Sequence, residues 1–173
     1  MKFYSGFSLQ NEQYLFTEYI DSSEYTVCGF SYGGIHALNT TVEMLKSFKR
    51  VDRLQLFSPT FFQSRDVKFH RLQLMSYKKN KENYMQQFLA ACFKPHEQKD
   101  VETIDTDISE LEELLGYEWS MESLKEIQNS GVKIEVYLGG KDSIIDVNAA
   151  KELFLEVATV TYINNANHFL QIS

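Results

Sequence analysis

Three residues of catalytic type lie where their side chains could act together: a serine, an aspartate and a histidine. The serine is Ser31, in Gly29-Phe30-Ser31-Tyr32-Gly33, between a β-prone run and a helix-period pattern. The spacing G-x-S-x-G suits a nucleophile, because a serine at a sharp strand-to-helix turn needs neighbours without side chains two residues away on either side. An ordinary glycine-rich turn has the same pattern, so the rest of the chain must decide between them.

A serine nucleophile needs a base to take its proton, and histidine is the usual one. The chain has four histidines. His36 should point away from Ser31 along the following helix, while His70 and His96 lie among charged residues of helical character. His168 follows the last predicted strand, near the edge where the functional loops of an open α/β sheet meet. We therefore predict that His168 is the base.

The acid that orients the histidine should also follow a parallel strand. Asp142 comes four residues after the clearest strand pattern, Val132 to Leu138. Asp146 is the alternative, although it is better placed to cap the helix that begins at the next residue. With Asp142 favoured, the chain order is Ser, Asp, His, which is the order found in α/β-hydrolases.

An attacked carbonyl group also needs donors for the negative charge that develops on its oxygen. One predicted donor is the backbone N–H of Tyr32, directly after the serine. The other is the backbone N–H of Phe7, because the loop that contains it follows the first strand and Gly6 allows a close approach. A plain turn at Ser5-Gly6 is the alternative.

Strand and helix patterns alternate at both ends of the chain. The predicted strands are 1–4, 25–28, 53–57, 132–138 and 159–163, and the predicted helices are 9–20, 35–48, 65–77, 81–93, 108–115, 120–128 and 147–157. Between 60 and 127 only helical patterns occur. We therefore predict one α/β domain over 1–173, in which a helical lid of about residues 60–127 is inserted between core strands.

The composition is that of an ordinary globular protein, with 43% hydrophobic and 24% charged residues. No run approaches the ~18 apolar residues that span a bilayer, and the first residues lack the apolar stretch of a signal peptide. We expect a cytoplasmic protein without membrane contact. Cys28 and Cys92 have no metal-ligand spacing and should be free thiols. We predict neither a cofactor nor a metal.

The net charge of -7 conceals a basic segment. Between Lys46 and Lys81 there are ten basic residues and two acidic ones. Such a segment in an acidic protein suggests an anionic partner, although a solvated helical face would have the same composition. The negative total charge argues against nucleic acid.

The chain resembles the α/β-hydrolase superfamily over nearly its whole length. Three motifs in order carry this resemblance: Gly29-Phe30-Ser31-Tyr32-Gly33, Gly139-Gly140-Lys141-Asp142 and Asn167-His168. More narrowly, it is similar to the short pimeloyl-acyl-carrier-protein methyl ester esterases of biotin synthesis found in Helicobacter and its relatives. The opening Lys-Phe-Tyr-Ser-Gly-Phe, the adjoining Gln10-Asn11-Glu12, the turn Cys-Gly-Phe-Ser-Tyr-Gly and the small size carry this narrower match. Ser5-Gly6 replaces the His-Gly that is common in relatives.

The resemblance implies a truncated α/β-hydrolase fold. The usual eight-stranded sheet has the order 1-2-4-3-5-6-7-8, and strands 1, 2 and 4 have no counterpart here. About five mostly parallel strands flanked by helices should remain. The first of them would be an edge strand, so the protein should be a monomer or a dimer paired through this edge.

The resemblance also implies a reaction and a partner. The enzyme would hydrolyse the methyl ester of pimeloyl-[acyl-carrier protein], with Ser31 acylated, His168 moving the proton and water completing the cycle. The acidic carrier protein would dock on basic lid residues, for which the candidates are Arg65, Lys68, Arg71, Lys78 and Lys79. Two alternatives remain: a broad small-ester esterase or thioesterase, and a non-catalytic hydrolase-like binding protein.

Overall fold

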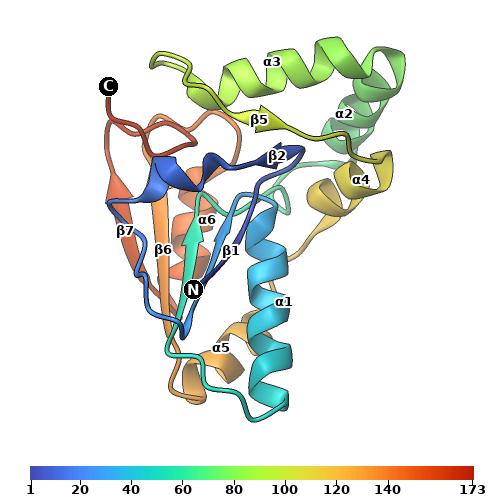
Figure 1. The fold of residues 1–173 in the computed structure, drawn as a ribbon. Helices are drawn as coiled ribbons and strands as arrows, with labels where there is room; N and C mark the ends of the chain where they lie inside the picture. The colour runs from blue at the N-terminus through green and yellow to red at the C-terminus, as the bar shows by residue number, and fades with distance from the viewer.

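A parallel five-stranded sheet runs through the computed structural model, which describes residues 1–173 (Figure 1). Its order is β1-β3-β4-β6-β7, and all neighbouring strands are parallel. The strands are β1 (Lys2–Tyr4), β3 (Thr26–Phe30), β4 (Arg53–Phe57), β6 (Lys133–Gly139) and β7 (Thr159–Ile163). The predicted α/β class and five-strand order are confirmed. β1 is an edge strand, while pairing of two copies through it stays a prediction.

Each face of the sheet has its own apolar layer. Alternate residues of the central strands, such as Leu56 and Val136, face α1 (Gly33–Lys46), α5 (Met121–Asn129) and α6 (Val147–Phe154) in the larger core. The opposite face packs a smaller aromatic cluster. Its largest members are Phe16, Phe30, Phe57, Phe93 and Phe169. Strands buried on both faces explain why β3 has no exposed residue.

The segment between β4 and β6 contains α2 (Val67–Lys79), α3 (Lys81–Phe93), β5 (Glu102–Thr103), α4 (Ile108–Gly116) and α5. In Figure 1, the first four of these lie beyond the carboxyl ends of the strands, whereas α5 lies at the other end, beside α1. We call residues 58–120 the insertion. None of the helices has both the length and the apolar composition needed to cross a membrane.

Side-chain caps explain where the helices of this segment begin. The cap residues are Asp66, Asn80, Asp107 and Ser120, each of which accepts a hydrogen bond from a backbone N–H in the first turn that follows. The predicted starts therefore lie within two residues of the observed ones. Short polar residues before an apolar period are a strong start signal.

The prediction of a helix over 9–20 is wrong. Residues Leu9–Gln10 form β2, and Glu12–Phe16 form a 3-10 helix, η1, after a left-handed Asn11 with φ of 64°. β2 pairs antiparallel with β5, a short strand in the insertion where we expected none. Two residues are too few to show an alternating pattern, so long-range pairing decides the structure here.

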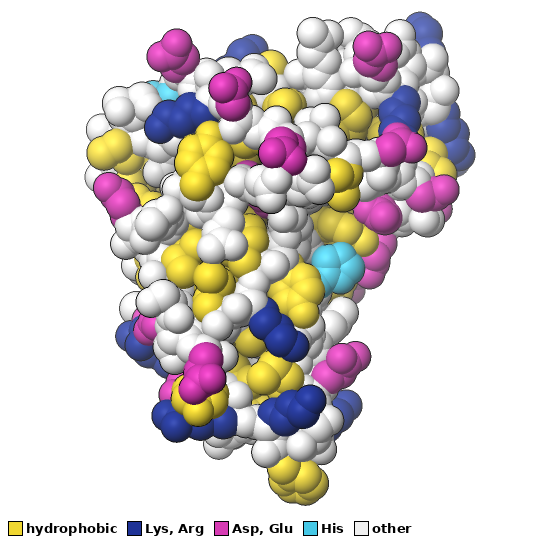
Figure 2. All heavy atoms as spheres, viewed as in Figure 1, with side chains coloured by type: hydrophobic (Ala, Val, Ile, Leu, Met, Phe, Trp, Pro, Cys, Tyr) yellow, Lys and Arg dark blue, Asp and Glu magenta, His cyan; other side chains and the backbone are white.

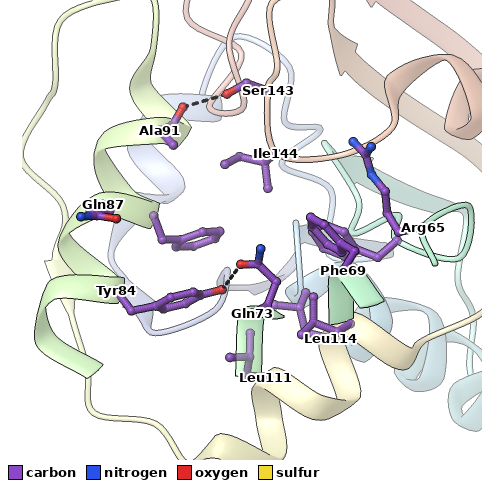
Figure 3. A pocket seen from close by; sticks show the side chains of 13 residues that line it. Arg65, Phe69, Gln73, Tyr84, Gln87, Ala91, Leu111, Leu114, Ser143 and Ile144 are labelled. Carbon is purple, nitrogen blue, oxygen red and sulfur yellow. Dashed lines mark hydrogen bonds between the residues drawn. The ribbon is translucent and has the colours of Figure 1, made fainter. Parts of the chain in front are cut away.

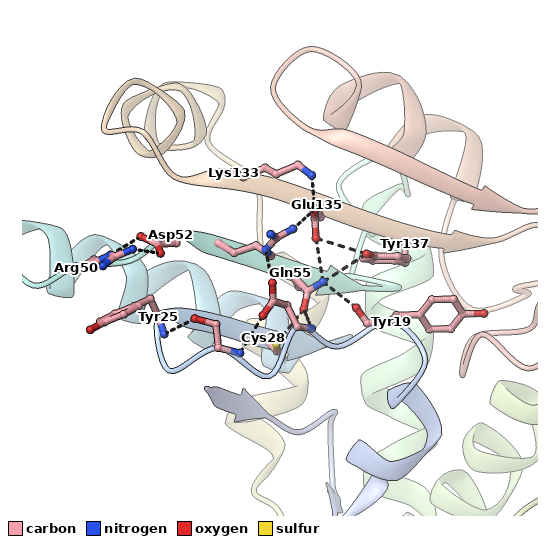
Figure 4. A network of polar contacts seen from close by, with 12 residues as sticks. Tyr19, Tyr25, Cys28, Arg50, Asp52, Gln55, Lys133, Glu135 and Tyr137 are labelled. Atoms are coloured by element: carbon pink, nitrogen blue, oxygen red, sulfur yellow. Dashed lines mark hydrogen bonds and ion pairs between the residues drawn. The ribbon is translucent and has the colours of Figure 1, made fainter.

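A polar network lies on the sheet face opposite α1 (Figure 4). Glu135 accepts bonds from Arg53 Nη1 at 2.5 Å, Lys133 Nζ at 2.7 Å and Gln55 Nε2 at 2.9 Å. Arg53 also contacts Asp21 at 2.9 Å. Gln55 is 1% exposed, so its amide is satisfied entirely within the protein.

Candidate active site

Ser31 lies at a tight turn between β3 and α1, and its φ of 50° is left-handed. Few residues other than glycine adopt this region, so the conformation is strained. A Cβ on Gly29 would lie 2.3 Å from Gly33 O, and one on Gly33 would lie 2.1 Å from Tyr4 O. Both glycines are therefore required sterically, and the turn presents Ser31 at the carboxyl edge of the sheet.

The structure brings Ser31, His168 and Asp142 together in one line. His168 Nε2 lies 3.0 Å from Ser31 Oγ, and His168 Nδ1 lies 2.6 Å from Asp142 Oδ2. The His168 side chain is 1% exposed and that of Asp142 is 0% exposed. Asp146, the alternative acid, lies elsewhere and caps α6 by accepting from Ala149 N at 3.1 Å. This is the geometry of a nucleophile, its base and the group that orients the base.

The loop that contains His168 is fixed by its neighbour Asn167, which is fully buried. Asn167 Nδ2 donates to Phe93 O at the end of α3 at 2.7 Å and to Gln171 Oε1 at 2.8 Å. A Cβ on Gly139 would lie 2.3 Å from Asn167 O, so the end of β6 and this loop are in close contact. The position of His168 is therefore set by both the sheet and the insertion.

The carboxylate of Asp142 is held from the other side. Its Oδ1 accepts from Ile144 N at 2.8 Å and from Ile145 N at 3.4 Å, which leaves Oδ2 for His168. These backbone donors fix the rotamer of Asp142 without placing a cation beside it. The histidine is thus the single basic side chain that contacts this carboxylate.

The two predicted backbone donors are unpaired. The N–H groups of Tyr32 and Phe7 have no hydrogen-bond partner within the chain. Tyr32 precedes α1, whose amino terminus favours negative charge. The rings of Phe7 and Tyr32 meet edge to face, with centroids 6.2 Å apart. The role of both groups as oxyanion donors stays a prediction.

The other histidines lie away from Ser31. His36 packs against Tyr32 and Tyr4, and the remaining two contact backbone carbonyl oxygens in loops, His70 that of Phe62 and His96 that of Asn165. No group of three or more His, Cys, Asp or Glu side chains is arranged to hold a metal ion.

An apolar cavity of about 310 Å³ lies between the insertion and the loop of Asp142 (Figure 3). Its thirteen lining residues include Phe69, Phe88, Leu111, Leu114 and Ile144. Tyr84 Oη and Gln73 Oε1 meet in it at 2.9 Å, and burial raises the pKa of Tyr84 to about 12.

The cavity is next to the predicted site but does not include it. None of the three aligned side chains lines it. Ile144 in its wall follows Asp142 closely, and Phe88 in its wall packs against Phe7, with ring centroids 6.2 Å apart. Ser31 itself is 4% exposed. The cavity therefore lies beside the loop of Asp142 and the loop of Phe7, and Ser31 is covered.

The basic segment predicted to bind an anionic partner is divided between two ends of the molecule. Lys46, Lys49, Arg50 and Arg53 lie between the end of α1 and the start of β4, far from the insertion (Figure 1). The five docking candidates, Arg65, Lys68, Arg71, Lys78 and Lys79, are exposed in or just before α2, and none forms an ion pair. Figure 2 shows dark-blue basic side chains over the corner where α2 meets α3, with acidic ones beside them.

Sequence reasoning missed the part played by Glu12. This residue is completely buried, and its Oε1 accepts from Gly6 N at 2.7 Å. An acid in the first turn of a helix usually faces solvent, so the expected helix over 9–20 gave it no role. The signal that could have found it is Asn11, because asparagine tolerates a left-handed conformation and so can end one element and start another.

No protein-family model matches the chain, and no curated protein matches its sequence. Among solved structures, the chain is similar to naproxen esterase (carboxylesterase NP) from Bacillus subtilis, with 20% identity and a TM-score of 0.55. That match covers 85% of this chain and 54% of the esterase. The chain thus spans about half the length of this relative.

Two further solved structures extend the likeness. A lipase-esterase related protein from Clostridium acetobutylicum matches at 15% identity and a TM-score of 0.55, over 91% of this chain and 65% of that one. An alpha/beta superfamily hydrolase from Oenococcus oeni matches at 14% identity and a TM-score of 0.52, over 98% and 85%. At such identities the likeness shows the fold, which is that of the α/β-hydrolases.

Proposed function

We propose that this chain, on its α/β-hydrolase fold, is a serine hydrolase of carboxylic esters. The observation that carries the proposal is the line of contacts from Ser31 Oγ through His168 to Asp142. His168 Nε2 takes the proton of Ser31 as Oγ attacks the ester carbonyl, and Asp142 stabilises the imidazolium that forms. The names of the similar solved structures, which include esterases, agree with this chemistry.

The two halves of the reaction use the same groups. Collapse of the first tetrahedral intermediate expels the alcohol, which receives its proton from His168, and leaves an acyl group on Ser31. Water then attacks this acyl group while His168 accepts its proton, and the acid is released. The free N–H groups of Tyr32 and Phe7 donate to the oxyanion in both steps.

For the substrate, we propose the methyl ester of pimeloyl-[acyl-carrier protein]. The resemblance noted in the sequence supports it, and so do the adjacent cavity and the burial of Ser31. The cavity beside the site is apolar and, at about 310 Å³, lies at the small end of ligand pockets, which suits a short acyl chain. Ser31 is 4% exposed, so the ester reaches it when the insertion opens.

The carrier protein would dock on the exposed basic residues of the insertion. α2 contains no acidic residue, and Lys68, Arg71, Lys78 and Lys79 on it are exposed and free of ion pairs. An acidic partner can therefore approach them without displacing an internal carboxylate. Nucleic acid and membranes are not proposed as partners, and the proposed place of action is the cytoplasm.

The decisive assay measures methanol release from carrier-bound pimeloyl methyl ester and from free pimelate methyl ester. Wild-type protein should have a higher kcat/KM for the carrier-bound ester than for the free ester. Ser31→Ala and His168→Ala should each release methanol from both esters about 10⁴-fold more slowly, or slower still. Equal activity on both esters would indicate a broad esterase. Absence of hydrolysis, together with failure of a serine-directed phosphonate to label Ser31, would indicate a non-catalytic binding protein.

Docking has its own matched pair of variants. The double substitution Lys78→Glu, Lys79→Glu reverses charge on α2 and should raise KM for the carrier-bound ester about tenfold at low salt. Lys46→Glu, Lys49→Glu makes the same charge change at the opposite end of the molecule and should leave this KM unchanged. Equal effects of the two doubles, or an equal effect on the free ester, would remove the docking proposal.

A further inference from the structure

The loop that contains Phe7 is held by a buried carboxyl group without a cationic partner. Glu12 is 0% exposed, and no Lys, Arg or His lies within ion-pair distance of it. Its Oε1 accepts from Gly6 N at 2.7 Å, whereas its Oε2 has no hydrogen-bond partner. A buried carboxyl group in this state costs stability, so its position calls for a compensating role.

That role follows from which peptide groups the contacts fix. Glu12 holds the peptide N–H of Gly6, and the carbonyl oxygen of Gly6 accepts from Leu9 N at 3.1 Å. In a trans peptide the N–H points opposite to the C=O, so the Leu9 bond directs the N–H of Phe7 away from Leu9. Two hydrogen bonds, on successive peptide groups, therefore set the direction of the predicted donor.

Packing places this loop against the residue before the nucleophile. A Cβ on Gly6 would lie 2.8 Å from the ring of Phe30, so the backbone of Gly6 is already in contact with that ring. Phe7 packs on Tyr32, the residue after the nucleophile. The loop thus meets the turn of Ser31 on both sides, and a rotation of the Gly6 peptide would move the Phe7 N–H relative to Oγ.

We propose that Glu12 is a positioning residue for hydrolysis: its carboxyl group fixes the Gly6 peptide so that the N–H of Phe7 donates to the oxyanion formed at Ser31. The proposal rests on the proposed ester hydrolysis and adds a residue to it. Burial raises the pKa of Glu12, although the Gly6 N–H opposes this.

Substitution separates the acceptor from the rest of the side chain. Glu12→Gln keeps an oxygen acceptor at the same distance and should retain kcat within about twofold. Glu12→Ala removes the acceptor and should lower kcat by about 10- to 100-fold, with KM for an ester changed less than twofold. If Glu12→Ala does not fold, Glu12→Asp, whose carboxyl group is one methylene short of Gly6, takes its place in the same assays.

A trifluoromethyl ketone reads the oxyanion site directly, because Ser31 adds to it to form a hemiketal oxyanion. Its inhibition constant should rise in Glu12→Ala by the factor by which kcat falls, and should stay unchanged in Glu12→Gln. A purely structural role would instead lower the thermal stability of Glu12→Ala without this parallel change. Thermal unfolding of each variant is therefore measured alongside.

Three results would overturn the inference: wild-type kcat in a folded Glu12→Ala or Glu12→Asp, a loss of kcat without loss of ketone affinity, or an equal loss in Glu12→Gln. Failure of the proposed function looks different. Wild-type protein would then neither hydrolyse esters nor bind the ketone, and both proposals would be rejected together.

Discussion

The molecule contains two polar clusters, each built around a buried carboxylate, and the two carboxylates have different kinds of partner. In the network of Figure 4, the carboxylate of Glu135 contacts Arg53 and Lys133, which are permanent cations. In the candidate active site, the carboxylate of Asp142 contacts His168 and backbone N–H groups. In the first cluster the carboxylate is paired with cations that keep their charge. In the second, the histidine beside the carboxylate can gain or lose a proton.

The two clusters also differ in where their residues lie in the sheet. Glu135 and Arg53 lie within β6 and β4, where each side chain is fixed by its strand. Ser31, Asp142 and His168 lie on loops just after β3, β6 and β7. In an open parallel sheet the strands give a rigid frame and the loops at their carboxyl ends carry the chemistry. A buried carboxylate therefore indicates function when it lies just after a strand and its partner can gain or lose a proton.

Of the changes that compare the two clusters, Asp142→Asn should have the largest effect. The amide can still accept from Ile144 N, but it cannot stabilise a charged imidazole or hold the same tautomer of His168. We expect kcat for ester hydrolysis to fall about 10⁴-fold while the unfolding temperature changes little. Steady-state kinetics and thermal unfolding on the same preparation measure both, and a fully active Asp142→Asn would remove Asp142 from the catalytic line.

Glu135→Gln should lower stability and leave kcat almost unchanged. It removes the carboxylate that Arg53 and Lys133 share, while Arg53 keeps its contact with Asp21. Because both cations are partly exposed, the loss of unfolding free energy should be about 2 kcal/mol, below that of fully buried pairs. Urea unfolding measures it, and kcat should stay within twofold. Arg50→Gln, which breaks the exposed pair with Asp52, is the matched control and should leave stability almost unchanged.

The smallest expected effect is a change with pH in the difference in unfolding free energy between wild type and Glu135→Gln. Burial alone would raise the pKa of Glu135, but the bonds from Lys133 and Gln55 and the charge of Arg53 outweigh it and hold the pKa below its ordinary value of 4.5. A lowered folded-state pKa adds stability above the unfolded value that is lost as pH falls through the folded one. The gap between wild type and Glu135→Gln should therefore narrow below about pH 4.5. A gap that is constant with pH would mean that the pKa of Glu135 is the same in the folded and unfolded states.

The residues of the candidate site could be predicted because local chemistry constrains them. The glycines beside Ser31 are needed on steric grounds that a sequence displays, since any Cβ there would strike backbone. His168 and Asp142 follow strands whose β-branched runs are easy to recognise. The sheet order followed from the resemblance, and the observed order agrees with it.

The rest depended on contacts that no short pattern encodes. Glu12 and Tyr19 fit a helical period, yet left-handed conformations at Ser8 and Asn11 break the helix, and only tertiary packing selects them. The basic segment is continuous in the sequence, but four of its ten basic residues lie at the other end of the molecule, because β4 runs from one end of the sheet to the other before the remaining six. Sequence distance is a poor guide to surface charge when a strand that crosses the molecule intervenes.

The pairing of β2 with β5 has a consequence for folding. It joins the donor loop to the insertion, and Ser8 Oγ, which follows Phe7, meets Thr106 Oγ1 across 98 residues of sequence. Ser31 and His168 are 137 residues apart. Closing such long loops is entropically costly and comes late, so local helices should form before these contacts do. During refolding, helical circular dichroism should return early, and a nucleophile with its base and donors in place should be among the last features of the native state to appear.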